Sequence, residues 1–195
     1  LGDSQRSNAA VHGAELRLGE EVVERLALAF DGFIAKHRLE FSADHPQARL
    51  QLRMAGGYDG AQWSGLLQAL DLASGPLGDW RLQRPVQLAF GPERAQAGLL
   101  CLLRADAHLC AEGEWQAAGA AKGRFDLAEL PLAWFKPLFP EGIQQVTGVL
   151  SARGEVSQVK ASLQGCATAE VTPGEVLFTD AHVTERLAHS GAELQ

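Results

Sequence analysis

Two stretches decide the fold of this chain: Arg49-Leu50-Gln51-Leu52-Arg53-Met54 and the longer run Trp80-Arg81-Leu82-Gln83-Arg84-Pro85-Val86-Gln87-Leu88-Ala89-Phe90. In both stretches apolar side chains recur at every second position. Successive side chains of a β-strand point to opposite faces of its sheet, so this alternation predicts strands with one apolar and one polar face. The pattern outranks the helix propensity of the many leucines, and we predict an all-β chain with antiparallel strands.

Shorter alternating runs continue the pattern at Ala14–Leu18, Leu26–Phe30, Leu39–Ala43, Phe125–Leu127, Val159–Leu163 and Val176–Phe178. Turn signals such as Asp59-Gly60 and Gly91-Pro92 separate the runs at intervals of roughly 8 to 15 residues, a spacing typical of antiparallel meanders. We expect about twelve strands on this basis. Residues Glu20–Leu28 fit either a short helix or a strand, and the strand is favoured because alternation begins at Leu26.

The segment Leu130–Phe139 departs from alternation. Its sequence, Leu-Pro-Leu-Ala-Trp-Phe-Lys-Pro-Leu-Phe, contains prolines that exclude a central strand. Pro131 suits the first turn of a helix, and Pro137 prevents the helix from continuing. We therefore expect one or two turns of amphipathic helix that lie against the apolar face of the sheet or plug one end of it.

A wide sheet must cover its apolar face, and alternation leaves three solutions open. The sheet can fold back over itself as a sandwich, close into a barrel, or curl without closing. Glycines inside apolar runs, such as Gly65, Gly148 and Gly154, permit sharp coiling. In the open form the apolar face becomes a trough, and an exposed apolar surface of that size marks a ligand or partner site.

Composition limits the classes of function. The chain has 195 residues, 46% of them hydrophobic, and its 17 Lys+Arg against 24 Asp+Glu give a net charge of −7. An acidic chain is a poor partner for nucleic acid, because non-specific affinity comes from cations on phosphate. No apolar run approaches the roughly 18 residues of a membrane-spanning helix. Without an initiator Met or a signal region, we expect residues 1–195 to be a single segment of a longer protein.

The run Leu99–Cys110 predicts a hairpin around the two-residue loop Ala105-Asp106. In that register Cys101 faces Cys110 at a non-hydrogen-bonded position, where Cα atoms lie about 4.5 Å apart, within reach of a disulfide. We favour a Cys101–Cys110 disulfide, and with it an oxidising compartment, over two buried free cysteines. Cys166 has no predicted partner and is expected to be a small core residue.

No catalytic or metal-ligating motif stands out. The six histidines are scattered without the spacing of a zinc site, and the glycine-rich stretch Gly56–Gly60 opens no helix, so it is a turn rather than a phosphate loop. His108 and Glu112 are interpreted as solvated residues of the polar face, and the four tryptophans as packing residues. We expect no enzyme activity, no cofactor and no metal.

A set of short motifs resembles the TamB family of bacterial envelope proteins, in its C-terminal half, over about Leu50 to Phe178. The motifs are Trp63-Ser64-Gly65; Gly78-Asp79-Trp80-Arg81-Leu82 with Pro85; Leu100-Cys101-Leu102 with Leu109-Cys110; Gly113-x-Trp115; Leu130-Pro131-Leu132; and Gly148-x-Leu150. Their order and spacing are specific as a set.

The resemblance implies a protein anchored in the inner membrane that crosses the periplasm as a long, open, curved β-sheet with an apolar concave interior. It also implies that the protein acts with TamA, an outer-membrane barrel protein, in the insertion of nascent outer-membrane proteins. A further implication is phospholipid transfer between the two membranes. Phospholipid acyl chains are then expected on a groove lined by Leu50, Leu52, Met54, Leu82, Val86, Leu88, Leu100, Leu102, Leu109 and Trp115. The alternative is a chaperone-like module that binds unfolded outer-membrane strands by β-augmentation, and a third option is a spacer between the membranes.

Overall fold

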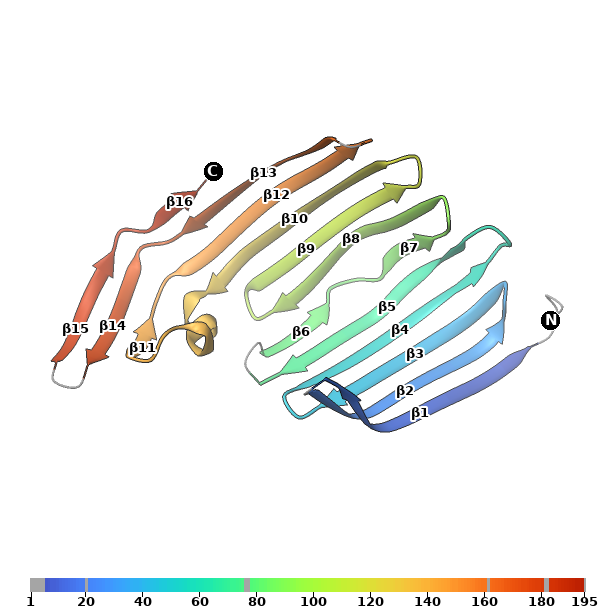
Figure 1. Cartoon of the computed structure of the whole chain (residues 1–195), viewed down its shortest axis with the longest axis horizontal. Coiled ribbons are helices and arrows are strands. Elements are labelled where there is room, and N and C mark those ends of the chain that lie inside the picture. Colours follow the sequence, from blue (N-terminus) through green and yellow to red (C-terminus); the bar gives the residue numbers. More distant parts are fainter. Residues whose placement is uncertain (1–5, 20, 76–77, 161, 181–182, 195) are drawn as a thin grey trace.

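The computed structural model describes residues 6–19, 21–75, 78–160, 162–180 and 183–194, and it confirms the all-β prediction (Figure 1). A 13-stranded antiparallel sheet runs in the order β1-β2-β3-β4-β5-β6-β8-β9-β10-β12-β13-β16, and β7 pairs with β5 and β8. Strands β11, β14 and β15 form a second, 3-stranded sheet. The bounds are β1 (Ser7–Leu18), β2 (Glu21–Phe33), β3 (Lys36–His45), β4 (Ala48–Tyr58), β5 (Trp63–Ser74), β6 (Gly78–Leu82), β7 (Val86–Phe90), β8 (Arg94–Arg104), β9 (Ala107–Gln116), β10 (Ala120–Pro131), β11 (Ile143–Val146), β12 (Val149–Val159), β13 (Ser162–Val171), β14 (Gly174–Asp180), β15 (Val183–His189) and β16 (Ala192–Leu194).

Two alternating runs are interrupted in the structure. The run Trp80–Phe90 is split into β6 and β7, which share one position in the sheet between β5 and β8. Pro85 lies at the break, because proline has no N–H to donate to a strand ladder. The run Val159–Leu163 spans a turn, since β12 ends at Val159 and β13 begins at Ser162. The segment Glu20–Leu28 is a strand from Glu21 onward, and Glu20 lies outside the described residues.

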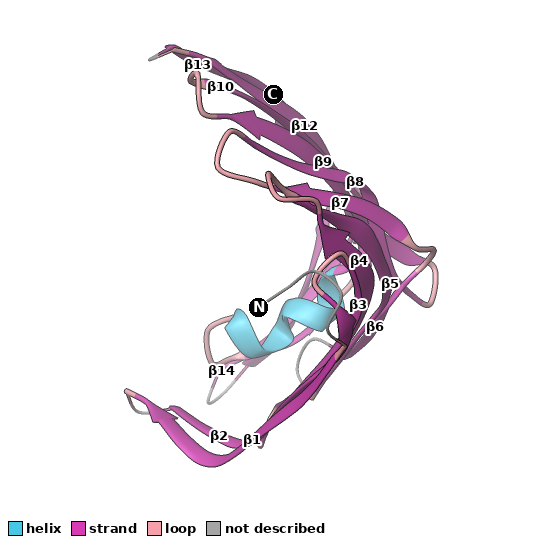
Figure 2. Ribbon diagram, turned by 90° about the vertical axis from the view of Figure 1, so that its right-hand side faces the viewer, coloured by secondary structure: helices cyan, strands magenta, loops and turns pink. Residues whose placement is uncertain are grey.

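The large sheet curls without closing, as Figure 2 shows, so the open form is the observed solution. Burial is correspondingly thin. The buried hydrophobic residues of the described chain are Leu67, Val86, Cys101, Ala107, Leu130 and Val146. Since no large side chain in the described ranges is fully buried, the sheet has no close-packed sandwich core.

The register of the strands assigns side chains to the two faces of the sheet. Directly opposed residues of antiparallel strands share a face. Leu102 opposes Leu82 on one side and Leu109 on the other, and Leu109 opposes Leu127. We call the face that carries these leucines the concave face, and the opposite one the convex face. Figure 2 supports the names, because the helix that packs beside these leucines lies inside the curve of the sheet.

The predicted short helix is a 3-10 helix, η1 (Leu132–Leu138), between β10 and β11. Its Trp134 meets Trp80 edge to face, with ring centroids 6.0 Å apart, and Arg104 Cζ lies 3.5 Å from the centroid of the Trp134 ring. Arg104 follows Leu102 by two positions in β8 and so lies on the concave face. The helix therefore packs on the apolar face. Neither η1 nor any other helix of the described chain is long and apolar enough to cross a membrane.

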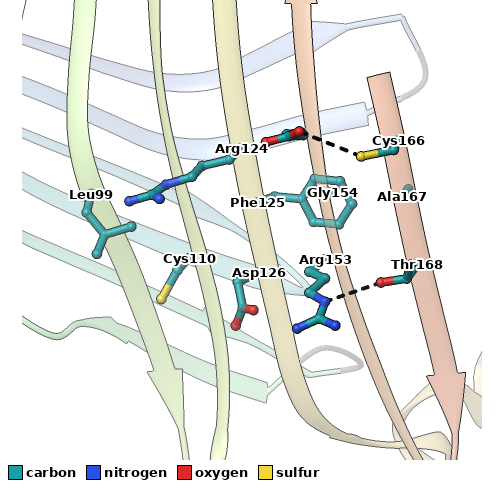
Figure 3. A pocket seen from close by; sticks show the side chains of 11 residues that line it. Leu99, Cys110, Arg124, Phe125, Asp126, Arg153, Gly154, Cys166, Ala167 and Thr168 are labelled. Carbon is teal, nitrogen blue, oxygen red and sulfur yellow. Dashed lines mark hydrogen bonds between the residues drawn. The ribbon is translucent and has the colours of Figure 1, made fainter. Parts of the chain in front are cut away.

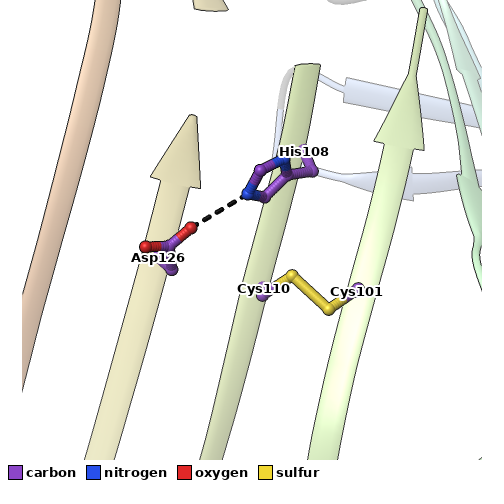
Figure 4. The surroundings of a disulfide bond; sticks show 4 residues. All are labelled: Cys101, His108, Cys110 and Asp126. Carbon is purple, nitrogen blue, oxygen red and sulfur yellow. Dashed lines mark hydrogen bonds and ion pairs between the residues drawn. A yellow bond between two sulfur atoms is a disulfide. The ribbon is translucent and has the colours of Figure 1, made fainter. Parts of the chain in front are cut away.

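The β8–β9 hairpin has the predicted register and the predicted disulfide. Arg104 opposes Ala107 around the two-residue loop, and Cys101 opposes Cys110, to which it is bonded (Figure 4). The Cys101 carbonyl accepts a hydrogen bond from the Gln83 N–H at 2.9 Å, on the side away from β9. The N–H and C=O of one strand residue point toward the same neighbouring strand, so the backbone groups of Cys101 point away from Cys110. The cysteine pair therefore occupies a non-hydrogen-bonded position, as expected.

Candidate functional site

The predicted lining residues share the concave face. Met54 opposes Leu67, which opposes Val86, and Leu88 opposes Ala97 across the next pair of strands. The same register places on this face the whole set Leu50, Leu52, Met54, Leu82, Val86, Leu88, Leu100, Leu102, Leu109 and Trp115. One continuous surface thus joins residues far apart in sequence, while their part in lipid binding stays a prediction.

Side-chain size changes along the concave face. On β2 and β3 it carries large side chains such as Leu28 and Phe41, which oppose each other. On β12 and β13 it carries small side chains, such as Ala152 opposite Ala169, between larger ones. Large apolar side chains of this face are most exposed toward the two ends of the sheet, at 59% for Val11 on β1 and 70% for Leu163 on β13. Both ends of the sheet, near β1 and near β13, therefore offer a more exposed apolar surface than its middle.

A buried histidine lies at the edge of this surface. His37, 9% exposed, accepts a hydrogen bond at Nε2 from the indole N–H of Trp63 at 2.9 Å. Its Nδ1 lies 3.1 Å from the Phe33 carbonyl oxygen and 3.0 Å from that of Ile34. Because an indole N–H only donates and a carbonyl only accepts, this geometry requires a neutral imidazole with its hydrogen on Nδ1.

Facing glycines make the contact between Trp63 and His37 possible. Trp63 on β5 reaches His37 on β3 across β4, at the point where Gly56 opposes Gly65. A Cβ on Gly56 would lie 2.5 Å from the Trp63 ring, and one on Gly65 would lie 2.8 Å from it. Sequence reasoning treated Trp63 as a packing residue and missed this pair. The detectable signal was the glycine in each of two neighbouring runs beside a tryptophan.

Ion pairs follow the convex face. Arg25 on β2 and Arg49 on β4 both reach Asp44 on β3, at 3.0 and 2.8 Å. The hydrogen bond from Arg49, with the positive charges nearby, holds the pKa of Asp44 below its usual value. Farther along the sheet Lys122 lies 3.1 Å from Glu114 on the neighbouring strand. Opposite charges are thus paired across strands on the face away from η1.

The structure adds partners to His108 and Glu112 and corrects the expected position of Cys166. His108 and Glu112 lie on the convex face, but each has a partner: His108 lies 2.9 Å from Asp126 (Figure 4), and Glu112 lies 2.8 Å from Arg124. The expectation that Cys166 is a core residue is wrong. It is exposed, with its thiol 3.8 Å from a Glu155 carboxylate oxygen, because the open sheet has no core on its convex side.

A hollow of about 510 Å³ lies on the convex side of strands β8 to β13 (Figure 3). Its border includes Leu99, Cys110, Arg124, Asp126, Arg153 and Thr168. Charges of both signs surround it, and Arg153 donates to the Thr168 hydroxyl at 3.4 Å. Within the described ranges no group of three or more His, Cys, Asp or Glu residues could hold a metal ion. Apolar atoms such as those of Leu99 and Phe125 also line this hollow, so it differs from the concave face in the charged side chains at its border.

The fold and its two faces define an open, curved β-sheet protein whose apolar face is covered by η1 only at one end. The family model for the N-terminal domain of TamB matches residues 2–188, and the chain belongs to this family. No curated protein and no solved structure matches it. Membership implies a role in outer-membrane protein assembly and lipid transport, a TamA partnership, and a non-catalytic protein that is anchored in the inner membrane and spans the periplasm. The disulfide fits an oxidising periplasm.

The match also corrects the position that the motifs suggested. They were assigned to the C-terminal half of the family, whereas the matching domain is N-terminal. Alternating strands joined by short turns repeat along such a sheet. Short motifs of tryptophan, glycine and leucine therefore identify this kind of sheet without locating a segment within it.

Proposed function

We propose that residues 1–195 form one groove segment, in which the concave face carries the acyl chains of phospholipids that move between the inner and outer membranes. The observation that carries the proposal is the continuity of the lining set on a face that, among the described residues, no second sheet covers and η1 covers only at one end. Strands spaced about 4.8 Å apart give a sheet of this size a span of roughly 50–60 Å across its strands. Each methylene kept out of water on that surface contributes about 0.8 kcal/mol.

The same arrangement suits movement as well as binding. Apolar contacts are not directional, so neighbouring positions along the surface hold an acyl chain about equally well. Charged headgroups remain in water at the open side of the curve, where they need no buried partner. In the full-length protein such a groove supports outer-membrane assembly by supplying lipid.

Photo-crosslinking tests the proposal with controls on adjacent residues. A photoreactive amino acid at Leu52 or Leu102 faces the concave side, and one at Gln51 or Leu103 faces the convex side of the same strand. In the full-length protein we expect lipid adducts at Leu52 and Leu102, and none at the two controls. Equal adducts on both faces, or no lipid adduct anywhere, would contradict a lipid groove.

A charge on the concave face tests the same proposal by function. Leu102 is only half-buried, so an aspartate there stays in contact with water. We expect Leu102→Asp to keep the β-sheet circular dichroism and most of the melting temperature while lipid transport is lost. Leu103→Asp, on the convex face, keeps both. Unfolding of Leu102→Asp, or full activity of that variant, would count against a lipid path over this residue.

The chaperone-like alternative has one structural feature in its favour. Strand β1 is 12 residues long and lies at the edge of the sheet order, with β2 as its partner. An unpaired strand edge is a template for an added strand. Polypeptide adducts from a photoreactive residue at Ala10 or Val11, without lipid adducts at Leu52, would support this alternative. Adducts of neither kind would support the third option, a spacer between the membranes.

A further inference from the structure

The concave face is covered at one end of its strands and open at the other. On β9, Ala107 is 1% exposed and Trp115 is 44% exposed. On β10, Leu130 is 6% exposed and Phe125 is 42% exposed. Register places all four side chains on the concave face. The buried end is the one at which η1 lies inside the curve of the sheet (Figure 2), so η1 acts as a partial cover.

The helix η1 reaches strands that it does not follow in sequence. It begins directly after β10, yet Trp134 contacts Arg104 on β8 and Trp80 on β6. In the order of the sheet, β9 lies between β10 and β8. The Trp134 side chain therefore reaches past the position of β9 to the pair of strands that carries Leu82 and Leu102. It occupies part of the surface on which acyl chains are proposed to lie.

The position of η1 depends on a few contacts. The helix has seven residues in 3-10 geometry, and no side chain caps its N-terminus. Short 3-10 helices hold together poorly on their own and take their place from tertiary contacts. Here those contacts include one guanidinium stack and one edge-to-face indole pair, both made by Trp134. Such contacts are each worth less than the burial of a few methylenes, so an acyl chain competes with them.

We propose that η1 is a gate on the concave face, which the contact of Trp134 with Arg104 and Trp80 keeps closed and which opens when acyl chains take the place of Trp134. The proposal rests on the proposed function of the groove. It assigns Arg104 the task of holding the cover through the stack of its guanidinium on the Trp134 ring. Gly78, whose backbone packs against the Arg104 guanidinium, supports that guanidinium from the side of β6.

Two variants open the proposed gate, and one serves as a control. Arg104→Gln removes the cation and keeps the length of the side chain, and Trp134→Leu removes the ring from η1. Arg124→Gln makes the same change as the first variant on the convex face. In the full-length protein, hydrogen exchange of residues 132–138 should accelerate roughly threefold or more in both gate variants. It should not change in Arg124→Gln, and Arg104→Lys should restore much of the protection.

Lipid crosslinking then separates the gate from the groove. With a photoreactive residue at Leu102, close to η1, adducts should increase in both gate variants, while adducts at Leu52, on β4 and away from η1, stay constant. Unchanged exchange of residues 132–138 would overturn the gate, and so would faster exchange with unchanged adducts at Leu102. Absence of lipid adducts at Leu52 in the unmodified protein would instead contradict the proposed groove itself, which keeps the two failures distinct.

Discussion

Leu102 and Leu103 are neighbours on β8, and they lie on two surfaces that are stabilised in different ways. The concave face around Leu102 gains stability from apolar contact with residues such as Leu82 and Leu109. The convex face around Leu103 gains it from cross-strand ion pairs such as Arg124–Glu112 and from a disulfide. The comparison shows how a sheet can remain folded with an apolar face left open. Ion pairs and a disulfide stabilise the convex face without a packed core, and the concave face remains open to solvent over much of its length.

The largest expected effect comes from a charge at a fully covered position of the concave face. Val86 is 3% exposed, whereas Gln87, the next residue of β7, is exposed on the convex face. An aspartate at Val86 has no water and no partner, so Val86→Asp should lower the free energy of unfolding by about 3 kcal/mol or more. Gln87→Asp should cost less than about 0.5 kcal/mol. Denaturant unfolding measures both, and similar losses would remove the distinction between the faces.

The disulfide should have the next largest effect. Cys101 and Cys110 are nine residues apart, so on the chain-entropy model the bond stabilises by at most about 3 kcal/mol. The double variant Cys101→Ser, Cys110→Ser should lower the melting temperature accordingly, while Cys166→Ser, at an exposed free thiol, leaves it unchanged. Mass spectrometry of a non-reduced digest should show the Cys101–Cys110 link. A link to Cys166 instead would contradict the register of the hairpin.

A smaller loss is expected where the concave face contains a polar pair. Trp63→Phe keeps an aromatic ring over the facing glycines but removes the donor to His37, whose Nε2 is then left without its indole partner. An unsatisfied buried acceptor costs about 1–3 kcal/mol. Trp115→Phe, at a position 44% exposed, is the matched control and should change stability little. Equal melting temperatures of the two variants would show that the Trp63–His37 hydrogen bond contributes nothing.

Convex ion pairs should contribute less, and their contribution should depend on salt. The Arg124–Glu112 pair is close, at 2.8 Å, but the Arg124 side chain is 64% exposed. Arg124→Gln should therefore cost about 0.5 kcal/mol at low ionic strength and almost nothing near 1 M salt, where screening is strong. A loss that persists at high salt would indicate that the convex face also depends on packing.

The smallest effect is a pH dependence at the β4–β5 turn. The Asp59 carboxylate accepts hydrogen bonds from the backbone N–H groups of Gln62 and Ala61, at 2.8 and 2.9 Å, and these hold its pKa below the usual value. A lowered pKa gives stability that is present above the usual value near 4 and is lost as pH falls through the lowered one. As the pH is lowered from about 5 to about 3, the melting temperature of Asp59→Ala should therefore fall slightly less than that of the unmodified protein. A parallel decline in both proteins would contradict this role.

Strand identity could be predicted because it depends on local pattern. Arg49–Met54 alternates and lies within β4, and the turn at Ala105-Asp106 set the register of the cysteines. The break at Pro85 followed from the same local chemistry but was not predicted, because alternation continues across it. The contacts of Trp134 with Arg104 and of Trp63 with His37 could not be predicted. They join residues on elements that are not neighbours in the sheet, and periodicity carries no information on such pairs.

By itself, the sequence determined an antiparallel sheet with one apolar and one polar face, the disulfide, and the short helix after β10. These follow from side-chain alternation, turn geometry and proline chemistry, all of which act over a few residues. Only the tertiary structure decided that the sheet stays open, that Cys166 is exposed, and that η1 reaches back to β6. Curvature sums small twists over many strands, and side-chain burial depends on which distant strands that curvature brings together.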